Sequence, residues 1–296
     1  MCYYIFVDKI NTKEKEILMF NKYKNKYKLT NRTKEVSGHT LHRIKALKDF
    51  GDVKKGELGG WIENYSNLSQ NGNAWVYDGA MVWDNARVFG NAMIYDFASV
   101  YDSAIVYGNA NVYDIARIYG RGSVHGDARI FEASRVYNNA MVYGDAQIYG
   151  YAQVYDNAEV SDHARIFDSA QVRDKAWVYD NAHVFDHAQV FGSAYVGGYA
   201  YVSDKAQVYG DSSILGNVYI RENDEINDDK SYLTFHNTWS SGRDFIFVLS
   251  NQRWHVGCFN GTGEELIKKA YADSELSGKM YEMYVHFAEN VVKEQQ

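Results

Sequence analysis

The sequence contains no proline and only two cysteines, Cys2 and Cys258, in 296 residues. Without proline, no turn depends on the fixed φ angle that a pyrrolidine ring imposes. Two cysteines cannot build the dense disulfide framework of a small secreted domain, and a reducing cytoplasm suits such a chain. No apolar run approaches the roughly 20 residues that span a bilayer, and the N-terminus lacks the layout of a signal peptide. We therefore expect a cytoplasmic protein that does not enter a membrane.

Charge is unevenly divided along the chain. Residues 1–72 carry 14 Lys and Arg against 8 Asp and Glu, or +6. Residues 73–216 carry 9 against 17, or −8, and residues 217–296 carry 8 against 13, or −5, so the three parts give the −7 of the whole chain. Lysines alternate with tyrosines over residues 21–34, which allows weak nucleic-acid binding there and nowhere else. The alternative for this run is a solvated hairpin whose lysines protect a sheet edge.

A strict six-residue period fills the middle of the chain. From Ala74 to Ser212, 21 of the 24 positions spaced six apart are Ala and the other three are Gly or Ser. Two residues later, from Val76 to Ile214, all 24 positions are Val or Ile. Such a short period is typical of a β-solenoid, in which Ala and Val point inward from each short strand and a turn follows. Three strands make an 18-residue coil, so we predict about eight coils.

This pattern resembles that of the hexapeptide-repeat family, whose coils wind into a left-handed parallel β-helix; the handedness is what the resemblance implies. A second stretch, LKDFGDVKKGELGGWIENYSNLSQ at residues 47–70, is similar to the opening segment of bacterial and phage hexapeptide proteins that are often labelled acetyltransferases. We predict an all-β solenoid in three parts. These are a basic β-rich N-terminal cap (1–60), the hexapeptide-repeat β-helix (61–220) and an α+β C-terminal cap of a hairpin and a helix (221–296).

Large aromatic residues follow the inner Val or Ile in 18 of the 24 units, where they face outward. Residues 18 apart stack on one face, so the rings form columns. The candidate binding residues are Tyr77, Tyr95 and Tyr113 in the first column and Trp83, Tyr101, Tyr119, Tyr137 and Tyr155 in the second. Two explanations stay open. The stacked rings stabilise the sheets themselves, or the aromatic faces bind a protein partner or another copy of the chain.

Asp78, Asp96 and Asp114 lie in the turn beside the first column and complete the candidate binding residues. Carboxylates stacked about 4.8 Å apart repel one another unless something compensates. Hydrogen bonds from turn N–H groups would suffice. The alternatives are divalent cations that bridge the carboxylates, and an acidic ridge that imitates a nucleic-acid backbone. No residue spacing is typical of a metal site, so we expect no resident metal.

The resemblance also implies a catalytic alternative, an acyltransferase that uses acetyl-CoA. Such family members use a His as general base and a loop that projects from the coils, but this rod has no such loop. His125, in YGRGSVHGDARI, is a weak candidate for the base, because nearby glycines leave space but no carboxylate is paired with it.

We favour a non-catalytic binding or scaffold protein without a cofactor, phage- or prophage-associated as the resemblance implies. Its expected partner is a protein or another copy of itself. The alternatives are the acyltransferase and an acidic decoy that inhibits a nucleic-acid-binding defence protein.

Overall fold

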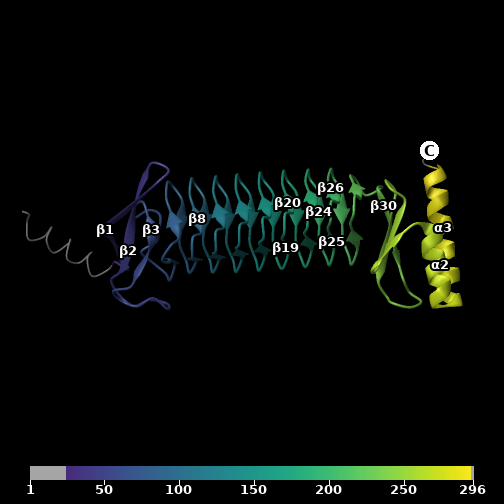
Figure 1. Ribbon diagram of the computed structural model, residues 1–296, viewed down its shortest axis with the longest axis horizontal. Helices are drawn as coiled ribbons and strands as arrows, with labels where there is room; N and C mark the ends of the chain where they lie inside the picture. The colour runs from purple at the N-terminus through teal and green to yellow at the C-terminus, as the bar shows by residue number, and fades with distance from the viewer. Residues whose placement is uncertain (1–24, 295–296) are drawn as a thin grey trace, which may run out of the picture.

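The computed structural model describes residues 25–294, which form a long rod with a different cap at each end (Figure 1). Strands β1 (Tyr27–Val36) and β2 (His39–Ala46) form an antiparallel hairpin at the N-terminal end. Strand β3 (Leu58–Ile62) pairs antiparallel with β2 and parallel with β5 (Met81–Val82) of the rod. The N-terminal hairpin is therefore continuous with one face of the rod. Among the described residues, no helix is both long and apolar enough to cross a membrane.

The rod consists of two-residue strands that begin every six residues, from β4 (Trp75–Val76) through β29 (Glu225–Ile226). Every third strand belongs to the same parallel sheet, so the rod has three faces. Backbone hydrogen bonds join each coil to the next, as from Tyr77 N to Ile94 O at 2.7 Å. The inward Val and Ile side chains are at most 1% exposed. The predicted β-solenoid is confirmed.

The rod is longer than predicted, with about nine turns in place of eight. Its last strands, β28 (Tyr219–Ile220) and β29, lie beyond the regular Ala pattern. Here Val218 and Asp224 occupy the positions that hold Ala elsewhere, while Ile220 and Ile226 stay buried. The inward apolar residue alone is thus enough to continue the coil where the small residue is lost.

The N-terminal cap supplies hydrogen-bond donors to the first coil. The buried Lys26 donates from Nζ to the carbonyl of Ala74 at 2.7 Å. The buried Asn67 donates from Nδ2 to the carbonyls of Asp84 and Ala86, both at 2.9 Å. Burial, aided by the charge of Lys48, lowers the pKa of Lys26 to about 8. Buried carbonyls at the start of the rod are therefore satisfied by side chains. The part of the predicted N-terminal cap before residue 25 lies outside the described residues.

The C-terminal cap is a four-stranded antiparallel sheet covered by two helices (Figure 1). Its elements are β30 (Tyr232–His236), β31 (Asp244–Val248), β32 (Arg253–Val256), β33 (Phe259–Gly261), α2 (Gly263–Asp273) and α3 (Glu275–Glu294). A capping box between Thr262 and Glu265 begins α2, because each side chain satisfies a backbone N–H that the helix leaves free. At the junction with the rod, His255 Nε2 lies 2.7 Å from Asp224 Oδ2, and both side chains are fully buried.

Candidate functional site

The second aromatic column is an unbroken ladder. From Trp83 to Tyr155 the successive ring centroids lie 4.5, 5.1, 4.8 and 4.9 Å apart, and neighbouring planes differ by at most 7°. Burial, as the main cause, raises the pKa of Tyr137 to about 12. Each ring face is thus covered mainly by its neighbours, and the ring edges are what the column presents to solvent.

His125 lies inside a third column of rings, in which Tyr107 and Tyr143 lie 18 residues before and after it. Its ring is stacked between Tyr107 and Tyr143, with centroid distances of 4.6 and 5.2 Å. Burial lowers the pKa of His125. A general base needs a group that orients it, and its position between two rings supplies none.

The first column is interrupted between Tyr95 and Tyr113. Tyr77 and Tyr95 stack at 4.4 Å, and the ladder resumes where Tyr113 stacks on Phe131 at 4.9 Å. A notch of about 450 Å³ lies at the interruption, lined by Tyr95, Asp96, Asn111, Tyr113 and Arg129. Four of the rod's ionisable or aromatic side chains therefore converge where the repeat pattern of rings fails.

Beside this notch, one corner of the rod exposes large apolar side chains. Phe97, Ile115 and Tyr151 are 68%, 57% and 72% exposed. They occupy the second turn position, where most other units hold polar residues or glycine. Phe97 follows Asp96, and Ile115 follows Asp114. These apolar residues were not among the predicted binding residues, because those are strand residues and aspartates of the turn. An apolar residue in a turn was the available signal.

The acidic ridge is built by hydrogen bonds between coils. Asp96 Oδ2 accepts from Asp114 N at 3.2 Å, and Asp114 Oδ2 accepts from Glu132 N at 3.0 Å. All three residues have positive φ values of 52° to 56°, which Asp tolerates better than most residues. The carboxylates thus serve the turn of the following coil, not their own. Asp78 differs, because it pairs with Arg43 of the N-terminal cap.

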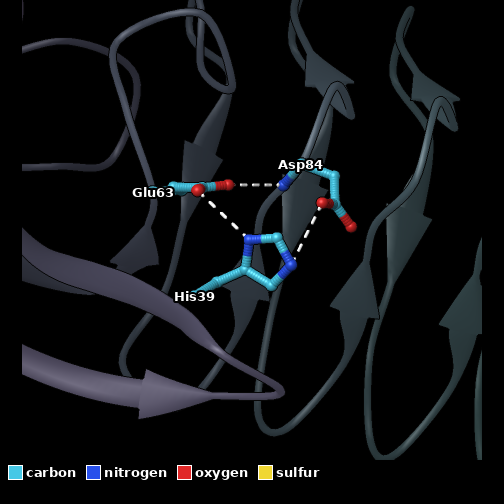
Figure 2. A group of neighbouring side chains, drawn as sticks. All are labelled: His39, Glu63 and Asp84. Carbon is cyan, nitrogen blue, oxygen red and sulfur yellow. Dashed lines mark hydrogen bonds and ion pairs between the residues drawn. The ribbon is translucent and has the colours of Figure 1, made fainter.

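A second site was not predicted from the sequence. His39 at the start of β2, Glu63 after β3 and Asp84 in the turn after β5 meet where the hairpin crosses the first coils (Figure 2). His39 Nδ1 lies 3.1 Å from Glu63 Oε1, and His39 Nε2 lies 3.2 Å from Asp84 Oδ1. Glu63 Oε2 also accepts from Asp84 N at 2.8 Å. One imidazole ring therefore joins two carboxylates from different segments.

The cluster is partly open to solvent, since the three side chains are 31%, 29% and 27% exposed in the order His39, Glu63, Asp84. The hydrogen bond to Glu63 is the largest cause of the raised pKa of His39. Burial lowers the pKa by a smaller amount, and the charges of Asp84 and Glu63 raise it further. The protonated ring is thus favoured between the carboxylates. A groove of about 460 Å³ lies beside the cluster, and its lining includes His39, Asp84, Tyr101 and Arg117.

Two comparisons bear on the family. A family model described as the YdcK beta solenoid repeat matches residues 134–150. Over 55 residues the chain is 42% identical to the uncharacterized acetyltransferase YdcK of Escherichia coli strain K12. That match covers 16% of this chain and 17% of that protein, so the chain spans less than a fifth of the relative that it matches. Together with the three-sided rod, these matches fit the hexapeptide-repeat β-helix family, and the fold of the chain is a parallel β-solenoid.

Proposed function

We propose that the protein is a non-catalytic binding protein whose rod presents one corner to a basic segment of a partner protein. We call this corner the corner surface, and it comprises Phe97, Ile115 and Tyr151 with the neighbouring Asp96 and Asp114. The observation that carries the proposal is that three apolar side chains, between 57% and 72% exposed, lie along one corner of the rod. Exposed apolar groups gathered on a soluble protein usually mark an interaction site.

The geometry of the corner surface suits an extended or helical segment. Phe97 and Ile115 lie on successive coils, and Tyr151 lies two coils further, so the three side chains form a line parallel to the rod axis. Stacked strands are about 4.8 Å apart, so the line is about 14 Å long. The rod is rigid because each coil is bonded to the next, so little ordering is required of this surface on binding.

Charge decides the kind of partner. The stretch of residues 73–216 has a formal charge of −8, and the ridge carboxylates lie directly beside the apolar line. A partner segment with alternating basic and apolar side chains can contact both the ridge carboxylates and the apolar line. The notch between Tyr95 and Tyr113 has both Asp96 and Arg129 on its wall, so the basic side chains of the partner are expected at the exposed carboxylates of the ridge and not in the notch.

The test uses fluorescent peptides of equal length with alternating Lys and Leu, Lys and Gly, or Glu and Leu. We expect anisotropy to show binding of the Lys–Leu peptide, weakened between 50 and 200 mM NaCl because salt screens surface charge. The variant F97S/I115S/Y151S should bind roughly tenfold more weakly or worse, which corresponds to about 1.4 kcal/mol. Its melting temperature should equal that of the wild type.

The matched control is Tyr199→Ser, which removes an exposed turn aromatic from a different corner (59% exposed). Equal binding of all three peptides, or equal loss in the control, would contradict the proposal. Concentration-dependent self-association that the triple variant abolishes would identify a second copy as the occupant, since residues 1–72 carry +6. Competition by duplex DNA for a captured basic protein would identify the decoy function.

The second candidate is an acyltransferase, and the observation that favours it is the name of the Escherichia coli relative. The position of His125 between two rings does not support it. Acetyl-CoA at millimolar concentration would raise the melting temperature of such an enzyme by mass action. We expect no shift.

A further inference from the structure

We propose that His39 and Asp84 bind a divalent first-row transition metal ion such as Zn²⁺, and that Glu63 positions the histidine for it. This site lies at the N-terminal cap and is separate from the corner surface. The two proposals therefore stand or fall independently.

The two donor atoms lie at a distance that one metal ion can bridge. His39 Nε2 and Asp84 Oδ1 are 3.2 Å apart. Two metal bonds of about 2.1 Å that meet at about 100° span this distance, which lies between octahedral and tetrahedral geometry. An ion can therefore replace the contact between ring and carboxylate with little movement of either segment.

A carboxylate supports the imidazole ring of His39 on its other side. His39 Nδ1 faces Glu63 Oε1 at 3.1 Å, so an Nδ1–H can donate to that carboxylate while a metal ion takes the place of the Nε2 proton that faces Asp84. Histidine ligands in proteins are commonly held in this way, and the carboxylate fixes both the tautomer and the ring orientation. Glu63 Oε2 also accepts the N–H of Asp84 at 2.8 Å, so one carboxylate holds both ligand-bearing segments.

The cluster of His39, Glu63 and Asp84 is open on one side. The adjoining groove of about 460 Å³ leaves the remaining coordination positions to water or a small anionic ligand, which Arg117 on the groove wall would attract. The chemistry of the donors selects the class of metal. Imidazole with carboxylate suits Zn²⁺, Mn²⁺ and Fe²⁺, whereas Ca²⁺ and Mg²⁺ prefer oxygen ligands only.

The neighbouring coil offers a built-in comparison. Asp102 lies 18 residues after Asp84 on the same corner of the rod and performs the same turn role, since its Oδ2 accepts from Gly120 N at 2.9 Å as Asp84 Oδ2 accepts from Asp102 N. His39 contacts Asp84 and not Asp102. A second pair, His163 and Asp145, has Nε2 and Oδ2 3.3 Å apart but is far more exposed, at 66% and 57%. Asp102 therefore has no contact with His39, and the pair of His163 and Asp145 is less buried than the proposed site.

The experiment is titration of the full chain with ZnCl₂ by calorimetry, with zinc per chain counted by mass spectrometry after dialysis. We expect one ion per chain in the wild type, in Asp102→Asn and in His163→Ala. His39→Ala and Asp84→Asn should lose it. Glu63→Gln should bind about 10- to 100-fold more weakly, because the orienting carboxylate is weakened but the ligands remain.

Circular dichroism of each variant separates metal loss from unfolding, and Co²⁺ in place of Zn²⁺ gives a visible spectrum that reports nitrogen and oxygen ligands. The absence of stoichiometric zinc in the folded wild type would overturn the proposal. So would wild-type affinity in a folded His39→Ala, or loss of the ion in His163→Ala alone.

Discussion

The rod and the caps differ in how often each contact occurs. A hydrogen bond or ring stack in the rod returns 18 residues later, as Tyr119 on Tyr137 is followed by Tyr137 on Tyr155. A contact in the caps, such as Lys26 on the carbonyl of Ala74, has no second copy. The stability of a repeat array is approximately a sum over neighbouring units, so one damaged coil costs only its own share. A damaged cap exposes the end of the whole array.

Two tryptophans make this comparison testable, because Trp75 and Trp177 occupy the same position in their six-residue units. Trp75 is fully buried under the N-terminal cap, with ring centroids 5.3 Å from Phe50 and 6.1 Å from Tyr27. Trp177 is half-buried on an open face and touches Tyr179 and Tyr195.

The largest effect is expected for Trp75→Ala. Emptying a fully buried tryptophan site costs about 3–5 kcal/mol in the free energy of unfolding. Trp177→Ala should cost at most about 1.5 kcal/mol, because much of that ring stays in water in the native state. Urea unfolding followed by circular dichroism measures both. Equal losses would break the distinction between cap and rod.

A smaller but still large effect is expected at the other cap. His255→Ala removes the buried imidazole beside Asp224 Oδ2 and leaves that carboxylate only the hydrogen bonds from Arg221 N and Asn251 Nδ2, which costs roughly 3 kcal/mol. His187→Ala, at an exposed turn of the rod, is the control and should be neutral within about 0.5 kcal/mol. Hydrogen exchange should place the loss in β28 and β29 and not in earlier coils. A uniform loss along the rod would show that the array unfolds as one unit.

The sequence predicted what repeats and missed what occurs once. The burial of Val76 and its equivalents follows from the six-residue period and the apolar side chains alone, since every unit places Val or Ile at the same inward position. His39, Glu63 and Asp84 have no common spacing, so only the fold of the cap over the first coil brings them together. Glu63 did carry a signal, because it occupies the place in the second column where a ring would precede Trp83. The interrupted ring stack beside Tyr95 depends on side-chain rotamers that a pattern of residue types does not contain.

The smallest expected effect concerns the rod alone and arises from the titration of its tyrosines. Burial raises the pKa of Tyr137 to about 12 from its ordinary value of 10, and the pKa values of Tyr101, Tyr119 and Tyr155 are also raised. A folded pKa above the unfolded one stabilises the protein below pH 10, and this stability is lost as the pH rises from 10 through 12. Solvent screens each half-exposed ring, so each contributes less than about 1 kcal/mol.

We therefore expect a melting temperature that does not respond to these tyrosines from pH 7 to 10 and then falls gradually, with phenolate absorbance rising over the same interval. Tyr137→Phe should make the fall in melting temperature only slightly smaller, since the other tyrosines of the second column still titrate. A variant that abolished the whole decline would mean that one tyrosine governs the rod. The principle that the rod distributes each effect over its coils would then be wrong.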